Sequence, residues 1–245
     1  MIITSAQIKV EIGDIVGNLQ KHLKMIDLAS EQYAKLIVFP EMSLTGYCRE
    51  EAATLAFSLQ DNRLEVLKAK ADKYQITIIV GAPVIIEDQL YIGSFIILPK
   101  QIVKVYTKQF LHKGEEVFFK ASFNYNPIIR IKDERISLAI CADINTETHA
   151  VNACKENTTL YIASIFFSEE GIEKGLQKLG YYGKRYGFAV LMANYSGTHW
   201  QIKAGGNSAF WSEHGEFKSK LTVIEEGLLI AIKEDKGWFT KSITI

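Results

Sequence analysis

Three side chains with complementary chemistry each stand at the end of a short apolar stretch. Cys141 follows Ile136–Ile140, and Glu41 and Lys108 follow stretches of similar length and β-branched content. Such stretches are typical of buried strands, so each reactive group is expected at the end of a strand. A thiol, a carboxylate and an ammonium together could attack an acyl carbon, because they supply a nucleophile, a base and a cation for the developing negative charge.

The segments between these residues predict a mixed α/β fold. We expect one helix capped by Asn18, a second beginning near Asp61, and antiparallel closing strands around Glu213–Gly215. Strands are expected at 2–8, 36–39, 75–82, 89–98, 101–106, 128–132, 136–140, 159–166, 188–193, 207–212, 221–224 and 227–233, and further helices at about 149–155 and 170–186. This order indicates mixed sheets flanked by helices, in a single domain over residues 1–245.

Charge and cysteine usage narrow the class of protein. The formal net charge is zero, from 28 basic and 28 acidic residues, and no Lys/Arg-rich block occurs, so neither nucleic acid nor a membrane is an expected partner. No charged region followed by a long apolar stretch opens the chain, and no apolar run reaches membrane-spanning length, which favours a cytoplasmic location. The odd set Cys48, Cys141 and Cys154 lacks metal-type spacing and favours reduced thiols.

Several local motifs resemble a known family. They are Val38–Tyr47, Tyr106–Leu111 and Ile140–Asp143, with further matches at Ala193–Asn194 and Gly205–Phe210. The chain resembles the nitrilase superfamily of carbon-nitrogen hydrolases, in which a Glu, a Lys and a Cys occur in this order. The likeness extends over essentially the whole chain, and the motif around the glutamate is the most specific.

This resemblance implies a four-layer α-β-β-α sandwich that assembles into homodimers or larger oligomers. It also implies that Glu41 accepts the proton of Cys141, whose thiolate attacks the carbonyl carbon of a small amide. Lys108 and the backbone N–H of Ala142 would stabilise the oxyanion, and water would then hydrolyse the thioester. The resemblance implies no metal and no organic cofactor.

A second carboxylate is implied a few residues after the lysine. Glu115 and Glu116 both offer one, and the spacing to Phe119 favours Glu115, which would hold Lys108 charged or contact the leaving group. The chain also departs from the family pattern. Ala142 stands where an aromatic residue is common, and Phe110 where a histidine is frequent, so the pocket wall is expected to differ.

Substrate contacts are predicted from chain position. Tyr47 lies six residues after Glu41, Phe166 follows a strand end, and Asn194 ends the next strand. Core packing explains the two aromatic residues about equally well. Arg49 or Lys113 could reach a substrate carboxylate, while small neutral amides and ω-amides stay open.

Other functional classes are compatible with parts of the pattern. A silent scaffold would keep the fold without turnover, and a redox or acyl-transfer protein could use the same Cys141. Cys141, Asp143 and His149 could in principle bind a metal, although their spacing lacks the paired elements of metal motifs. The favoured function is hydrolysis of a non-peptide carbon-nitrogen bond, with primary amides, N-carbamoyl compounds and nitriles all open as substrates.

Overall fold

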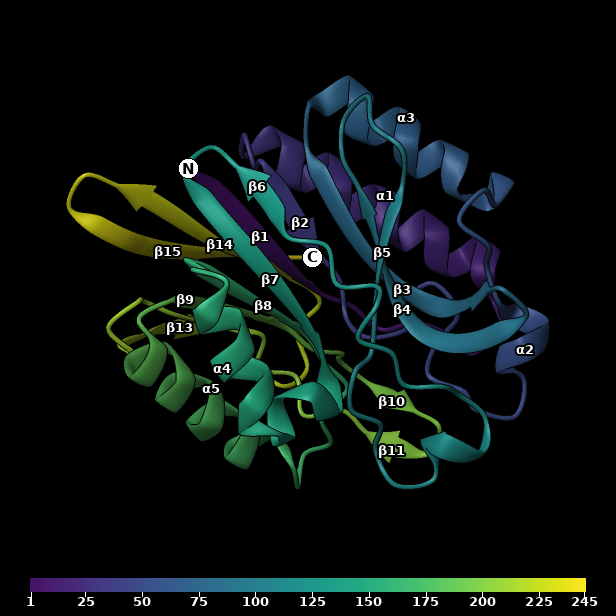
Figure 1. Cartoon of the computed structure of the whole chain (residues 1–245). Helices are drawn as coiled ribbons and strands as arrows, with labels where there is room; N and C mark the ends of the chain where they lie inside the picture. The colour runs from purple at the N-terminus through teal and green to yellow at the C-terminus, as the bar shows by residue number, and fades with distance from the viewer.

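Two facing β-sheets form the centre of the molecule in the computed structural model, which describes residues 1–245 (Figure 1). The strands are β1 (Ile2–Gln7), β2 (Leu36–Val38), β3 (Thr77–Ile86), β4 (Gln89–Ile97), β5 (Lys104–Thr107), β6 (Ile129–Ile131), β7 (Glu134–Ile140), β8 (Leu160–Ser164), β9 (Ala189–Ala193), β10 (Thr198–His199), β11 (Ile202–Lys203), β12 (Ala209–Trp211), β13 (Phe217–Lys220), β14 (Gly227–Glu234) and β15 (Gly237–Thr244). The helices are α1 (Ile15–Glu31), α2 (Ala52–Leu55), α3 (Glu65–Tyr74), α4 (Glu147–Lys155) and α5 (Ile172–Tyr186). One sheet has the order β15-β14-β1-β2-β3-β4-β5 and the other β13-β12-β9-β8-β7-β6, while β10 and β11 form a separate hairpin.

The sheets and helices stack as four layers, α-β-β-α, as the family resemblance implied. Helices α1 and α3 cover the outer face of the seven-stranded sheet, and α4 and α5 cover the six-stranded one (Figure 1). Three apolar cores fill the spaces between layers, one between the sheets and one under each helix pair. None of the helices combines the length and apolarity needed to cross a bilayer.

The alternation of side chains along central strands explains why both faces of each sheet are buried. In β2, Leu36 and Val38 enter the core between the sheets, and Ile37 enters the core beneath α1 and α3. In β8, Leu160 faces the other sheet and Tyr161 faces the second helix layer. Strands buried on both faces are apolar at nearly every position, which is why these stretches could be recognised in the sequence.

Strand direction determines where the reactive residues lie. Strands β1, β2 and β3 are parallel, and β5 runs in the direction of β3 because β4 is antiparallel to both. Strands β7, β8 and β9 are also parallel. The carboxyl ends of β2, β5 and β7 therefore deliver the segments that contain Glu41, Lys108 and Cys141.

The first helix begins earlier than predicted. Asp14 is the N-cap of α1 and accepts a hydrogen bond from Gly17 N at 3.0 Å, so the prediction of an Asn18 cap is wrong. Asn18 instead lies buried within the first turns, where its Nδ2 donates to the carbonyl oxygens of Glu11 and Leu44. Its polar side chain joins the loop before α1 to the segment after β2.

The closing strands also differ from the prediction. Strand β12 pairs with β13 at Phe217–Lys220, not with residues 221–224. Leu221 is buried in the core between the sheets without being part of a strand, and that burial accounts for the misleading apolar signal. Sequence reasoning missed β15, an edge strand that pairs with β14 and whose residues are mostly polar or exposed.

Candidate active site

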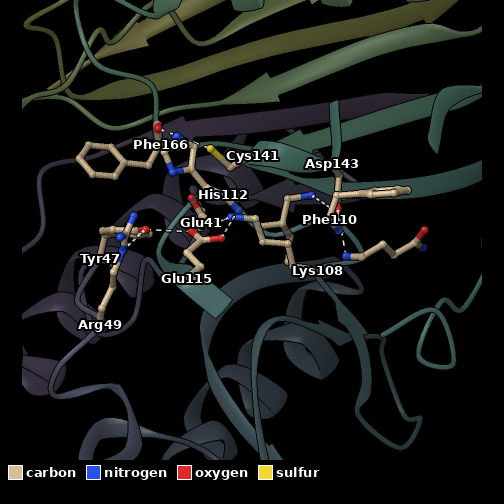
Figure 2. A network of polar contacts seen from close by, with 12 residues as sticks. Glu41, Tyr47, Arg49, Lys108, Phe110, His112, Glu115, Cys141, Asp143 and Phe166 are labelled. Carbon is tan, nitrogen blue, oxygen red and sulfur yellow. Dashed lines mark hydrogen bonds and ion pairs between the residues drawn. The ribbon is translucent and has the colours of Figure 1, made fainter. Parts of the chain in front are cut away.

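A buried ammonium between two carboxylates forms the polar centre of the site (Figure 2). Lys108 Nζ lies 2.7 Å from Glu41 Oε1 and 2.9 Å from Glu115 Oε1, and none of the three side chains is more than 1% exposed. Removing such charges from water is costly unless each has a close partner of opposite sign. Two of the three Lys108 N–H groups serve the carboxylates, which leaves the third for another acceptor.

Backbone packing holds the Glu41 segment in place. The hydroxyl of Tyr195, beyond β9 in the opposite sheet, donates to the carbonyl oxygen of Glu41. On the other side, β3 approaches so closely at Gly81 that a Cβ there would lie 2.3 Å from Met42 N and 2.9 Å from Pro40 O. Only glycine fits this approach, so the two sheets together fix where Glu41 stands.

Glu41 and Lys108 differ in protonation near neutral pH, because Lys108 stays protonated whereas Glu41 can gain or lose its proton. Burial raises the pKa of Glu41 to about 7, against the opposing effect of Lys108 and the weaker one of the Cys141 thiol. Burial disfavours the charge on Lys108, yet the negative charges of Glu41, Cys141 and Glu115 keep its pKa above the usual value. Glu41 Oε2 is buried and has no hydrogen-bond partner. Glu41 is therefore the member able to take up and return a proton.

Cys141 stands at the turn where β7 ends and a short 3₁₀-helix, Cys141–Asn145, begins. Its φ of +41° lies in the left-handed region, which side chains with a Cβ rarely adopt. Its half-buried thiol donates to the carbonyl oxygen of Phe166 at 3.5 Å. Burial, with the nearby charge of Glu41, raises the thiol pKa well above its usual value, so a base is needed to form the thiolate.

Asp143 joins the turn at Cys141 to the end of β5. Its Oδ1 accepts from the backbone N–H groups of Gln109 and Phe110 at 2.9 and 2.8 Å. Its Oδ2 accepts from Ile140 N at 2.8 Å and from the Tyr106 hydroxyl at 2.6 Å. Asp143 is fully buried, so this carboxylate anchors the segments that present Lys108 and Cys141.

The same hydrogen bonds argue against a metal site. His149 Nε2 meets the Tyr106 hydroxyl at 2.8 Å, and its Nδ1 meets the Tyr161 hydroxyl at 2.7 Å. Both Asp143 oxygens are already engaged by four donors, and no group of three or more His, Cys, Asp and Glu residues in the structure could hold a metal ion. Asp143 and His149 therefore have a structural role and do not join Cys141 in binding a metal.

Of the two candidate second carboxylates, Glu115 lies beside Lys108. Besides this ion pair, Glu115 Oε1 accepts from the Tyr47 hydroxyl at 2.8 Å, and Oε2 accepts from His112 N at 2.7 Å. Glu116 is exposed and accepts from Gly114 N instead.

A cavity of about 800 Å³ opens above this cluster. Glu41, Glu115 and Cys141 line its polar end, and Tyr47 and Phe166 form part of the wall, with ring centroids 5.2 Å apart. The structure thus brings together these five residues singled out in the sequence. The cavity is also lined by Trp200, in the turn between β10 and β11, and by several polar residues of α5, among them Lys174 and Lys178. The sequence had not indicated these residues. No sequence motif marks them.

Two predicted substrate contacts do not line the cavity. Asn194 is fully buried behind it, where its amide binds the backbone N–H and carbonyl of Phe167 and the carbonyl of Gly206. Its side chain therefore holds the wall segment and offers no free group to a substrate. Ala142 is 4% exposed, follows Cys141 in the 3₁₀-helix and is not part of the lining; its predicted contact is made by the backbone N–H and not by the side chain, so that contact stays a prediction.

The other two thiols lie outside the cavity lining. Cys48 is buried, and burial together with Glu51 and Glu50 raises its pKa to about 11. Cys154 is exposed at the end of α4, with its sulfur 3.8 Å from the carbonyl oxygen of Tyr186. Only Cys141 combines a cavity with an adjacent base and cation.

Comparison with known proteins identifies relatives over most of the chain. The model of the family described as carbon-nitrogen hydrolase matches residues 2–232. A glutamine-dependent NAD(+) synthetase of Thermotoga maritima is 26% identical over 238 residues, which is 93% of this chain and 41% of that protein. A second such synthetase, of Aquifex aeolicus, is 30% identical over 156 residues, 58% of this chain and 26% of that protein. The chain thus spans less than half the length of these relatives.

The fold is also found in solved structures. An amidase from Nesterenkonia sp. AN1 superposes with a TM-score of 0.86 at 21% identity, covering 96% of this chain and 94% of the amidase. At that identity the likeness concerns the fold, and the two chains share it over nearly their whole lengths.

Proposed function

This chain belongs to the carbon-nitrogen hydrolase family, and from that premise we propose that it hydrolyses the carbon-nitrogen bond of a small amide through a thioester on Cys141. The observation that carries the proposal is the buried group of Glu41, Lys108 and Glu115 beside the Cys141 thiol, at the polar end of one cavity. This arrangement supplies a nucleophile, a base and a cation to a single reacting carbon.

The first step forms the acyl-enzyme. Glu41 accepts the thiol proton of Cys141 through Oε2, the oxygen that lacks a partner, and the sulfur attacks the amide carbon. A Glu41 pKa of about 7 suits this task near neutral pH, because about half of the base is then ionised and its conjugate acid still releases a proton readily. The proton returns to the nitrogen, which leaves as ammonia or an amine.

Negative charge develops on the carbonyl oxygen as the sulfur adds. The third N–H of Lys108 and the backbone N–H of Ala142 are the proposed donors to this oxyanion. Loss of one such donor commonly reduces turnover by about 10²–10³. Glu115 would keep Lys108 charged and aimed at the reacting carbon, since it approaches Nζ at 2.9 Å.

The second step frees the acid. Water enters at the position vacated by the leaving group, gives a proton to Glu41 and attacks the thioester, after which the thiol is restored. Neither step requires a redox change, and the same carboxylate serves both.

The decisive experiment measures ammonia release and acylation together. Wild type is incubated with a panel of aliphatic amides, dicarboxylic monoamides, N-carbamoyl amino acids and nitriles, and the intact mass is recorded during turnover. We expect ammonia release from at least one class and an acyl adduct on Cys141, both lost in Cys141→Ala and retained in the control Cys154→Ala, whose thiol is exposed elsewhere. Stable absence of adduct and ammonia across the panel would refute hydrolysis and favour a silent scaffold.

Glutamine is the second candidate substrate, and its support is specific. Relatives named glutamine-dependent NAD(+) synthetases align with 93% and 58% of this chain. Glutamine therefore belongs in the same panel, and hydroxylamine added during turnover would detect transfer of the acyl group to an amine in place of water. Faster hydroxamate formation than acid formation would assign acyl transfer.

A further inference from the structure

Arg49 lines the cavity and forms no ion pair with this chain. Its one side-chain hydrogen bond runs from Nε to the Tyr47 hydroxyl at 2.9 Å. The two terminal nitrogens of the guanidinium are thus left without a hydrogen-bonding partner, on a half-buried side chain. An arginine in a cavity wall normally satisfies these donors with a carboxylate or another acceptor.

Aromatic and backbone neighbours keep this guanidinium in one orientation. Its Cζ lies 4.7 Å from the ring centroid of Trp200 and 5.5 Å from that of Tyr47. At Gly114 a Cβ would lie 2.8 Å from Nη1, so the missing side chain makes room for the guanidinium. Because the planar fork is held before any ligand arrives, little ordering entropy is lost when two oxygens bind it.

The charges around the cavity favour an anion. The acidic groups in its lining are Glu41 and Glu115, and both are already bound to Lys108. The remaining charged side chains are basic, namely Arg49 with Lys174 and Lys178 of α5. Lys174 is exposed and Lys178 donates to the carbonyl of Asn145, so Arg49 is the cation that is both fixed and free.

A hydrogen-bonded path connects this cation to the reacting groups. Arg49 donates to Tyr47, Tyr47 donates to Glu115, and Glu115 shares Lys108 with Glu41. In Figure 2, Arg49 and Tyr47 lie to the left of Glu115, and Cys141 lies above Glu115 and Glu41. One substrate could therefore meet Cys141 with one end and Arg49 with the other, within the same cavity.

We propose that the amide substrate carries a carboxylate at the far end of its acyl chain, and that Arg49 binds this carboxylate through Nη1 and Nη2. The inference rests on the proposed amide hydrolysis for its chemistry, but the anion site itself does not depend on turnover. A cationic amide is disfavoured in the same position, because Lys108 leaves at most one negative charge on the two acids of the lining, whereas Arg49 would meet the cation directly.

The test compares acidic and neutral amides of matched length. Dicarboxylic monoamides of three to six carbons are assayed against unsubstituted alkyl amides of the same lengths, with wild type, Arg49→Gln, Arg49→Lys and the control Lys113→Gln. Lys113 is exposed and does not line the cavity, so its substitution removes the same charge nearby without touching the proposed contact. The quantity compared is the ratio of kcat/KM for the acidic amide to that for the neutral amide.

We expect wild type and Lys113→Gln to favour one acidic amide, and Arg49→Gln to lose this preference by on the order of 100-fold, mainly through KM. Arg49→Lys should recover part of the ratio, because it restores the charge without the fork. Damage to Tyr47 or to the fold affects both substrates and cancels in the ratio. An unchanged ratio in Arg49→Gln, or a wild type that prefers neutral amides, would overturn the inference while leaving amide hydrolysis intact.

Binding to Cys141→Ala separates this inference from the proposed function. Calorimetric titration with the acidic and the neutral amide should show tighter binding of the acidic one, lost on adding Arg49→Gln. If that difference appears although wild type releases no ammonia, the anion site is supported and the proposed hydrolysis fails. If Cys141→Ala binds the acidic and the neutral amide equally well, with or without Arg49→Gln, the proposed anion site is wrong.

Discussion

Replacing Glu41 by glutamine is expected to stabilise the protein increasingly as pH rises. Burial raises the pKa of Glu41 from 4.5 to about 7. Between these values the folded chain keeps a proton that the unfolded chain releases, so ionising Glu41 costs folding free energy and stability falls as pH increases through this window. At about 1.4 kcal/mol for each tenfold change, the cost approaches roughly 3 kcal/mol once Glu41 is ionised in both states. The neutral amide removes that cost.

The comparison has to be made between variant and wild type at each pH, because other groups titrate in the same range. Burial lowers the pKa of His22 from 6.5 to about 4, so its contribution to stability is lost as pH falls, opposite in sense to Glu41. Subtracting the two proteins cancels His22. The Glu41→Gln substitution would also leave Lys108 paired with Glu115 alone, a neutral pair.

Calorimetric unfolding between about pH 5 and pH 8 measures the effect. We expect the difference in unfolding free energy between Glu41→Gln and wild type to grow by roughly 2–3 kcal/mol, which corresponds to a widening of about 5–10 °C in Tm for a chain of this size. The control Glu116→Gln, at an exposed carboxylate, should show a constant difference. A constant or shrinking difference for Glu41→Gln would refute the assignment of a raised Glu41 pKa.

The remaining predictions concern turnover and packing. The value of kcat/KM should rise with pH through an apparent pKa of about 7, because ionised Glu41 is the proposed base; a flat acid limb in a pH–rate profile would contradict this. Lys108→Ala should lower kcat by at least about 10²-fold, and combining it with Glu41→Gln should add little, since both residues are proposed to act in one step; steady-state kinetics of the double variant checks this. Gly81→Ala should destabilise by about 3 kcal/mol or more, because its Cβ meets the Met42 and Pro40 backbone, as a urea titration would show. Asp143→Asn should lower kcat while changing KM less, since an amide cannot accept hydrogen bonds from all four donors. Unchanged kcat in steady-state kinetics would show that Asp143 does not position the reacting groups.

The sequence predicted the mixed sheets and the place of three reactive groups at strand ends because both follow from buried strands. The apolar stretches of β2 and β7 mark strands covered on both faces, and parallel strands end at one edge. Glu41 and Cys141 closely follow such strands, so the local pattern predicts that each stands at a strand end. Strands β2 and β7 belong to different sheets, so the meeting of the two residues depends on how the sheets face each other, and that was implied by the family resemblance. The strand β5 likewise predicts that Lys108 stands at a strand end.

The features that sequence reasoning missed depend on contacts between distant segments. Nothing local shows that the turn after β10 places Trp200 against Arg49, or that Asn194 uses its amide on the backbone of Phe167. Asn18 is of a residue type that commonly caps helices, yet the turn at Gly13 lets the helix start earlier, with Asp14 as its cap. In each case a local preference was overridden by packing against another part of the chain.

Asp143 illustrates why the geometry of the site depends on a residue that need not touch the substrate. The turn at Cys141 holds a left-handed φ of +41°, a conformation that costs on the order of 1–3 kcal/mol and persists only where neighbours enforce it. Four hydrogen bonds to Asp143 provide that enforcement, and two of them come from the residues that follow Lys108. The turn at Cys141 and the segment that follows Lys108 are therefore held by one carboxylate, so loss of its donors is expected to change the separation of the proposed nucleophile from the proposed oxyanion donor.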